Sequence, residues 1–289
     1  MLLGTGTAEM GKAQMNLLVW GRAILQRSLL VVGCYPLIAC GSWLGNPKKP
    51  DEGSSPSASL IIQGITNPEG DALLAQNSSI QIFDDQGNAC GSISLSEARL
   101  VLKEITLEKN IDTNPSQADS DTDPTIPFKG GFKGPFVANL LNNSLTPTPG
   151  IIEIPSGSYL RAEGLLSKLT EGSVDRVDSK DTLTGHSLRI AGNFKALDGR
   201  ERNLAASLDI EQELPFAQRD TSKPFIANGG DHLELIVRFR LFNWFKGTAI
   251  SGLSGSGDII LDGSSRGESK AAYDRFKENV TSSATFSGK

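Results

Sequence analysis

From residue 60 onward, apolar residues recur at every second position in short runs that are separated by turn-forming residues. Alternation of this kind is typical of strands with one buried face, and clusters of Gly, Pro, Asn and Asp end such strands. The runs that show this pattern are 60–65, 79–83, 134–141, 150–155, 157–165, 187–194 and 203–211. The dipeptide Asp198-Gly199 separates the last two runs and predicts a hairpin turn between them.

The segment 97–108 fits neither a regular strand nor a regular helix. Leu100 and Leu102 alternate with polar residues, and Ile105 and Leu107 alternate again after a slip of one residue. An extra residue in one strand is the definition of a β-bulge. We therefore predict a bulged strand here rather than a helix.

The clearest strand in the sequence is predicted over residues 232–245. One face of this strand would carry Leu233, Leu235, Val237, Phe239 and Leu241. Short strands at near-regular spacing indicate a mainly β fold, and we predict an antiparallel β-sandwich, immunoglobulin-like or similar, of roughly eight to ten strands. Residues 267–280 have a helical pattern and predict a short C-terminal helix. A short strand is also expected at residues 259–261.

The first forty residues differ from the rest of the chain. Arg22 and Arg27 precede an uncharged, largely apolar stretch at residues 28–39. A basic segment, a short apolar segment and a small residue at the end are the parts of a secretory signal peptide. The stretch is shorter than the roughly 20 residues that a helix needs to cross a bilayer. A transmembrane anchor or a buried helix remains the alternative reading.

The apolar stretch ends in Leu37-Ile38-Ala39-Cys40. This motif resembles the lipobox of bacterial lipoproteins. The resemblance implies that a diacylglycerol with acyl chains such as palmitate is attached to the Cys40 thiol, and that a peptidase cuts between Ala39 and Cys40. Because residue 41 is Gly rather than Asp, the resemblance also implies a lipid anchor at the outer membrane of the cell envelope.

These features divide the chain into three parts. Residues 1–39 are predicted to be the lipoprotein signal peptide, with Met15 as an alternative start. Residues 40–59 are rich in Pro, Ser and Gly and predict a flexible tether, whereas residues 60–289 form the predicted β-sandwich domain. Removal of the signal peptide leaves Cys90 as the one cysteine without lipid, and we expect it to be a small buried residue rather than a reactive thiol.

A second resemblance rests on the order of elements within the predicted domain. The elements are a strand at 98–107, the run Phe136-Val-Ala-Asn-Leu-Leu141, the run Ile154-Pro-Ser-Gly-Ser-Tyr159, a strand pair across Asp198-Gly199 and the strand 239–245. This order is similar to that of a group of uncharacterised bacterial envelope lipoproteins with a β-sandwich domain. The resemblance covers most of residues 60–285 and implies a fold, but it carries over no catalytic residue.

Composition excludes some classes of function. The net charge of −5 argues against a nucleic-acid-binding protein, which would carry a basic stripe. With two histidines in the sequence, a His-rich metal site or a His-activated nucleophile is hard to assemble. The glycine-rich segment 252–257 lacks the Lys of a phosphate-binding loop, so we expect turns there.

One acidic segment is a candidate cation site. Asp119, Asp121 and Asp123 alternate along the chain, and Ca²⁺ takes about six to eight oxygen ligands. The spacing matches the start of an EF-hand loop, but Pro124 occupies the sixth position and Gly130 the twelfth. A Ca²⁺ site of another kind and a solvated acidic loop both remain open, and no other cofactor is predicted. Asp258 and Asp262 flank the short strand 259–261 as a minor alternative.

A second candidate site lies near the end of the strand 232–245. Arg238, Arg240 and Trp244 combine cations with an aromatic ring, which would suit a sugar or peptide ligand because rings stack on sugars and Arg donates hydrogen bonds. The alternative is a solvated face that ends in a core aromatic residue.

The leading functional hypothesis is a membrane-anchored envelope lipoprotein that acts as a non-enzymatic binding or structural module for protein or glycan. The alternative is a hydrolase of envelope or extracellular polymers that uses loop carboxylates. A deep cleft with two facing acids would favour the hydrolase, whereas a flat face would favour the binding module.

Overall fold

A computed structural model of the chain describes residues 54–66, 73, 78–109, 129–174, 180–219 and 225–289. The chain divides into two units, Met1–Asn46 and Pro47–Lys289, and all described residues belong to the second unit. Within the described ranges, no helix combines the length and the apolar character that crossing a membrane requires.

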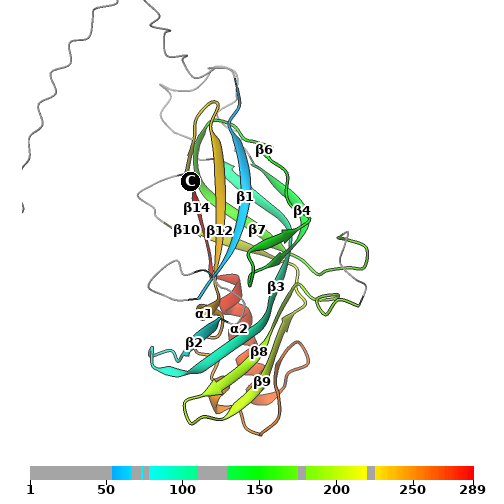
Figure 1. Cartoon of the computed structure of the whole chain (residues 1–289), viewed down its shortest axis with the longest axis vertical. Helices are drawn as coiled ribbons and strands as arrows, with labels where there is room; N and C mark the ends of the chain where they lie inside the picture. The colour runs from blue at the N-terminus through cyan, green and yellow to red at the C-terminus, as the bar shows by residue number, and fades with distance from the viewer. Residues whose placement is uncertain (1–53, 67–72, 74–77, 110–128, 175–179, 220–224) are drawn as a thin grey trace, which may run out of the picture. The chain divides into compact units, whose positions relative to one another are not determined.

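The described residues form a single mixed sheet of 14 strands (Figure 1). The strands are β1 (Ser57–Ile65), β2 (Ser79–Phe83), β3 (Ala89–Lys109), β4 (Lys129–Asn139), β5 (Ser144–Thr146), β6 (Ile152–Glu153), β7 (Gly157–Leu166), β8 (Leu188–Ala196), β9 (Glu201–Leu208), β10 (Gln212–Gln218), β11 (Phe225–Ala227), β12 (His232–Arg240), β13 (Ile259–Leu261) and β14 (Ala284–Gly288). The main path runs β13-β9-β8-β3-β7-β10-β14-β12-β1-β6, and β2, β4, β5 and β11 branch from it.

The 21-residue strand β3 connects two parts of this sheet because it changes neighbours along its length. Its first half pairs with β2 and β8, and its second half pairs with β4 and β7. The register against β4 and β7 shifts between Leu102 and Glu104, at the slip that the sequence indicates. The prediction of a bulged strand is thus confirmed, and a further shift against β8 lies between Leu95 and Glu97.

Strands from the two ends of the described region meet around β12. β1 pairs with β12 in parallel from Ser57↔His232 to Ile65↔Arg240. On the other side, β14 runs antiparallel to β12 and makes a short parallel pairing with β10. The last strand of the chain therefore lies inside the sheet and links β10 to β12.

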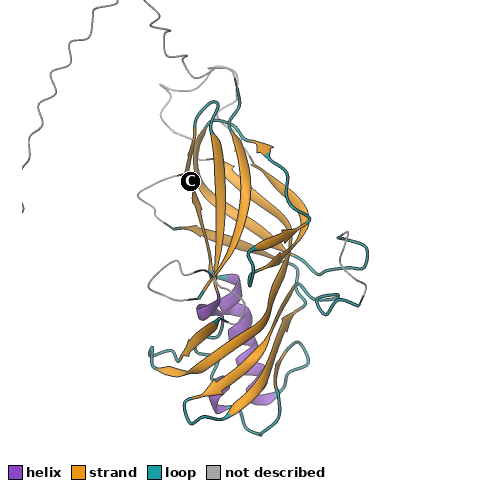
Figure 2. Ribbon diagram, viewed as in Figure 1, coloured by secondary structure: helices purple, strands orange, loops and turns teal. Residues whose placement is uncertain are grey.

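Both helices pack against strands. α1 (Leu241–Trp244) follows β12 directly, and α2 (Gly267–Thr281) buries Ala272, Tyr273, Phe276 and Val280. Figure 2 shows the two helices behind β2, β3, β8 and β9. The helix predicted at 267–280 is confirmed, although the chain continues from it into β14. A 3₁₀ turn, η1 (Ile250–Gly252), precedes β13.

Two apolar clusters hold the described residues together. The larger cluster includes the inward faces of the strands and the buried faces of α1 and α2, with Trp244, Phe239 and Phe276 at its centre. A smaller cluster lies apart from it and contains Val101, Val137, Leu169, Val174 and Leu183. It joins β3 and β4 to the segment between β7 and β8, which therefore has its own apolar contact with the sheet.

The prediction of a mainly β fold is confirmed. The antiparallel sandwich of roughly eight to ten strands is not confirmed, because the described residues form 14 strands linked in one sheet. Three pairs, β1·β12, β10·β14 and β9·β13, are parallel. The strand predicted to continue to residue 245 is wrong beyond Arg240, where the chain turns into α1. The short strand at 259–261 is confirmed as β13.

Candidate functional site

The predicted binding residues at the end of β12 do not share one exposed face. Arg238 is half-buried and its Nη1 donates a hydrogen bond to Ser287 Oγ at 2.6 Å, and Arg240 is half-buried as well. Trp244 is fully buried, with its Nε1 donating to Ser283 Oγ. Stacking on a sugar needs an exposed ring, so the structure removes Trp244 from the predicted binding face. The reason is that the chain enters α1 after Arg240 and turns Trp244 into the core.

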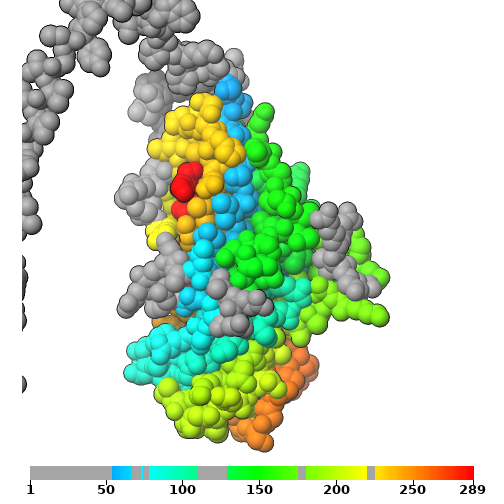
Figure 3. Space-filling view, viewed as in Figure 1, coloured from blue at the N-terminus to red at the C-terminus, as the bar shows by residue number. Residues whose placement is uncertain are grey.

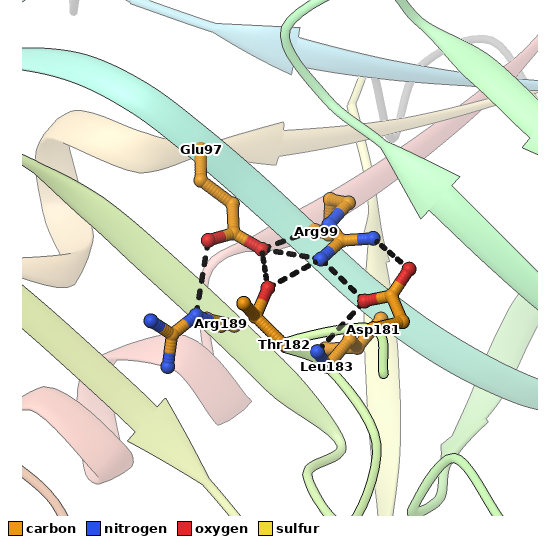
Figure 4. A network of polar contacts seen from close by, with 6 residues as sticks. All are labelled: Glu97, Arg99, Asp181, Thr182, Leu183 and Arg189. Atoms are coloured by element: carbon orange, nitrogen blue, oxygen red, sulfur yellow. Dashed lines mark hydrogen bonds and ion pairs between the residues drawn. The ribbon is translucent and has the colours of Figure 1, made fainter. Parts of the chain in front are cut away.

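The most extensive described polar network surrounds Arg99 on β3 (Figure 4). Its members are Glu97, Arg99, Asp181, Thr182 and Arg189, which we call the Arg99 cluster. Arg99 Nη1 and Nη2 donate to the two carboxylate oxygens of Asp181 at 2.8 and 2.7 Å, and Arg99 Nε donates to Glu97 Oε1 at 2.9 Å. Such a two-pronged contact is the strongest geometry available to an Arg–carboxylate pair.

Glu97 completes the cluster because it also binds the second arginine. Arg189 Nε donates to Glu97 Oε2 at 3.0 Å, and Thr182 Oγ1 donates to Glu97 Oε1 at 3.0 Å. Arg99 and Arg189 are direct cross-strand neighbours on β3 and β8, where two like charges would repel each other. Glu97 lies between them and offsets that repulsion.

The environment of the cluster lowers the pKa of both carboxyl groups. Burial alone would raise the pKa of Glu97, but hydrogen bonds from Arg99, Thr182 and Arg189 outweigh it and hold this pKa below its ordinary value. The hydrogen bond from Arg99 is the main reason that the pKa of Asp181 is lowered. The two carboxylates in turn raise the pKa of the Arg99 guanidinium against the effect of burial. Glu97, Asp181 and Arg99 therefore stay ionised near neutral pH.

The Arg99 cluster holds a loop on the sheet rather than presenting charge to a ligand. Asp181 and Thr182 belong to the segment between β7 and β8, and the small apolar cluster around Val101 lies beneath the same segment. The two arginines and the two acids are mutually paired, so the cluster is neutral as a whole. Sequence reasoning missed it because Asp181 lies 82 residues from Arg99.

We expect Arg99→Met to destabilise the protein by about 2 kcal/mol, because it leaves two half-buried carboxylates without their main partner. Both pKa values are lowered in the folded state, so this stabilisation is present above the ordinary carboxyl pKa and is lost as pH falls through the lowered values. Urea unfolding at neutral pH and near pH 3 is the measurement. The difference between wild type and variant should shrink in acid, and a difference that is equal at both pH values would contradict the assignment.

A small hollow lies on the outward face of the second half of β3. It has a volume of about 110 Å³ and is lined by Glu104, Thr106, Lys129, Glu163, Gly164, Leu165 and Glu213. Lys129 Nζ lies 3.7 Å from Glu163 Oε2. Pockets for drug-sized ligands have volumes of about 300–1,000 Å³, so this hollow is smaller than a typical ligand pocket.

An uncharged polar face covers the outward side of the first half of β3. Three cross-strand pairs define this face. Ser79 on β2 lies opposite Ser94 on β3, and Ser94 lies opposite Asn193 on β8. Asn193 in turn lies opposite Asn203 on β9. We call these four residues the uncharged row. They are exposed except for Asn193, which is half-buried. Figure 3 shows the lower front surface formed by β2, β3, β8 and β9, with no helix in front of it.

The residues next to the uncharged row are also polar, and charged residues lie beyond them. Gln81 and Ser92 are neighbours on β2 and β3, one step further along the strands. Beyond Ser92, Lys195 Nζ pairs with Glu201 Oε1 at 3.1 Å. At the end of the row, Asn203 Nδ2 donates to Asp258 Oδ1 at 3.1 Å. The amide and hydroxyl groups of the row are thus bordered by charges, and the Lys195–Glu201 border is paired internally.

One Ser–His contact joins the first residues of β1 and β12. Ser57 Oγ lies 3.0 Å from His232 Nδ1, and His232 is exposed. The Ser57 N–H donates to the Asp231 carbonyl, so it is not available to stabilise an oxyanion. The contact fastens the ends of two parallel strands.

The other predicted site residues are placed as follows. Cys90 is half-buried, and its Sγ lies 3.6 Å from the Asn88 carbonyl oxygen. Asp262 accepts hydrogen bonds from the N–H and Oγ of Ser264. In the described part of the chain, no group of three or more His, Cys, Asp or Glu side chains is arranged to hold a metal ion. Asp119, Asp121 and Asp123 lie outside the described residues, as do Ala39 and Cys40, so those predictions stay open.

Comparisons with protein-family models, with curated proteins and with solved structures find no significant match to this chain.

Proposed function

We propose that this protein is a lipid-anchored lipoprotein of the cell envelope whose β-rich domain is a non-enzymatic binding module for protein or glycan. The observation that carries the proposal is the Leu37-Ile38-Ala39-Cys40 motif at the end of an apolar stretch. The fold is compatible with it, because β1 begins at Ser57, near the end of the segment 40–59 whose composition predicts a tether. One acyl chain binds a membrane only marginally, whereas the two or three chains of a lipoprotein would anchor the domain stably.

The domain supports a binding role through its outward faces. The uncharged row lies on a face of the sheet, and the described hollow is small. A module that holds a protein or a glycan at the envelope needs an accessible surface and an anchor rather than a deep pocket. The outer membrane is the proposed location, because Gly41 follows Cys40.

The test is the Cys40→Ala variant, expressed with its own leader in a Gram-negative host. We expect the wild type to lack residues 1–39, to carry acyl mass and to partition into detergent, whereas the variant stays as a water-soluble or membrane-trapped precursor without lipid. Intact mass spectrometry and detergent phase separation measure both properties. Wild type that behaves like Cys40→Ala would overturn the proposal.

Two further cysteine variants serve as controls. Cys90→Ala removes a thiol within the folded domain and should leave the lipid in place. Cys34→Ala is the closer control, because Cys34 also lies in the apolar stretch and follows the small residue Gly33. Loss of acyl mass in Cys34→Ala with normal acylation in Cys40→Ala would place the anchor at Cys34 and contradict the assignment to Cys40.

A further inference from the structure

We propose that Asn228 is a site of spontaneous covalent modification, at which the side-chain amide is converted to aspartate and isoaspartate through a succinimide ring. Asn228-Gly229 is the only Asn-Gly dipeptide in the sequence. It begins the turn from Asn228 to Asp231, which joins β11 to β12 and which we call the Asn228 turn. The reaction consumes only water, so it depends neither on the lipid anchor nor on the binding role proposed above.

The reaction has two steps and needs no enzyme. In the first step, the main-chain nitrogen of Gly229 attacks the side-chain carbonyl carbon of Asn228. The new C–N bond closes the ring, the bond to Asn228 Nδ2 breaks, and ammonia leaves with the proton of the Gly229 N–H. In the second step, water opens the ring at one of its two carbonyl carbons. Opening at Cγ yields aspartate, whereas opening at the main-chain carbonyl yields isoaspartate, whose main chain runs through the former side chain.

The Asn228 turn leaves the attacking nitrogen accessible. Asn228 and Gly229 are exposed, and within the described ranges the Gly229 N–H has no hydrogen-bond partner in the protein. The next two N–H groups are engaged, since Gly230 donates to the Ser54 carbonyl at 2.9 Å and Asp231 donates to the Asn228 carbonyl at 3.1 Å. Most main-chain N–H groups in a folded protein are paired in this way. Gly229 thus combines exposure, a free N–H and the absence of a Cβ that would shield the nitrogen.

Asp231 slows the reaction because it holds the amide that must leave. Asp231 Oδ2 accepts hydrogen bonds from Asn228 N at 2.9 Å and from Asn228 Nδ2 at 3.1 Å. The leaving nitrogen must gain a proton to depart as ammonia, and a hydrogen bond that it donates to a carboxylate works against that step and restricts rotation of the amide. We therefore expect the conversion to proceed in the folded protein, but more slowly than in the unfolded chain.

Asn143 provides an internal comparison, because it is also followed by a small residue, Ser144. There the Ser144 N–H donates to Asn142 Oδ1 at 3.1 Å, and Asn143 Oδ1 accepts a hydrogen bond from the Gly64 N–H at 3.0 Å. The nucleophile is engaged and the side chain is held in place. Asn143 should therefore stay intact under conditions that convert Asn228.

Conversion of Asn228 weakens the contact between the Asn228 turn and the chain that enters β1. This contact consists of the Ser57 N–H donating to the Asp231 carbonyl at 2.8 Å and of the Gly230 N–H donating to the Ser54 carbonyl. Isoaspartate lengthens the main chain of the turn. Either product also places a carboxylate where Asn228 Nδ2 now donates to Asp231, and two like charges at this spacing repel each other. The first residues of the described domain therefore loosen as the protein ages.

The test is incubation of the purified protein at mildly alkaline pH, followed over weeks by peptide mapping with mass spectrometry. We expect the peptide that contains Asn228 to gain the mass difference between an amide and an acid, and to separate into aspartate and isoaspartate forms. Gly229→Ala should slow the conversion by about tenfold or more, because a Cβ shields the nitrogen. The fold tolerates this variant, since the φ of Gly229 lies outside the left-handed region and the added Cβ would lie 3.4 Å from the Ser54 carbonyl oxygen.

Asp231→Ala is the opposite variant, because it releases the amide and should speed the conversion several-fold; thermal unfolding before incubation shows whether its fold is retained. Hydrogen exchange at the Ser57 and Gly230 amides should be faster in aged than in fresh wild type. Asn228 that stays intact in the folded protein but converts in urea, equal conversion of Asn143, or an unchanged rate in Gly229→Ala would overturn the proposal. A folded Asp231→Ala that reacts no faster would overturn the role of Asp231, and unchanged exchange after ageing would overturn the effect on the turn.

Discussion

A chain that ends at Ser283 is expected not to fold into the sheet described above. The deletion removes β14, which lies between β10 and β12 and contributes the buried side chains of Ala284 and Phe286. Loss of a buried Phe side chain alone costs about 3–5 kcal/mol, and the backbone hydrogen bonds of β12 lose their partners as well. Because domains are stable by about 5–15 kcal/mol in total, these losses together exceed what the fold can tolerate.

Circular dichroism and urea unfolding measure the result. The truncated chain should show no cooperative transition, and a transition like that of the wild type would contradict the placement of β14. A chain that ends at Gly288 is the graded control. It loses only the backbone hydrogen bonds between Lys289 and Glu234, so it should remain folded and be less stable by about 1–2 kcal/mol.

Trp244→Ala is expected to destabilise the protein by about 3–5 kcal/mol. The ring is fully buried and makes edge-to-face contacts with Phe239 and Phe276, at centroid distances of 6.2 and 6.5 Å. Removing it opens a cavity between β12 and α2 and leaves Ser283 Oγ without its indole donor. Urea unfolding followed by circular dichroism measures the change.

Two control variants give smaller stability changes against which the effect of Trp244→Ala is compared. Trp244→Phe keeps most of the apolar volume and should cost about 1–2 kcal/mol. Leu197→Ala removes an apolar side chain that is 73% exposed in the β8–β9 turn, so it should change stability by less than about 0.5 kcal/mol. A small effect of Trp244→Ala, similar to that of Leu197→Ala, would mean that the ring is available to solvent, as the predicted binding face requires.

The alternation of apolar residues was sufficient to predict most of the strands and the bulge in β3, because one-sided burial imposes a period of two on the sequence. It did not predict β5, β11 or β14, nor β10, where Pro215 lies between the buried residues Leu214 and Phe216. Proline is tolerated there because β10 pairs with β7 at that point and reaches β14 only at Ala217 and Gln218. Parallel pairing was also missed, since a strand's own pattern does not record the direction of its neighbour.

For the candidate surfaces too, some features could be predicted from the sequence and others could not. Arg238 and Trp244 are close together in the sequence, which predicts a cation beside an aromatic ring. Whether both side chains point to the same face depends on where the strand ends, and β12 ends at Arg240. The Arg99 cluster and the uncharged row each bring together residues from segments far apart in the chain. Such surfaces depend on register between strands, which is fixed by the packing of the whole sheet.

Under the N-terminal anchoring that we propose, the parallel pairing of β1 with β12 has a mechanical consequence. A tension that enters the domain at Ser57 along the strand axis would load the ladder from Ser57↔His232 to Ile65↔Arg240 in shear, so its hydrogen bonds would share the force instead of opening one after another. Ser57 and His232 would take the first part of that load at the strand ends.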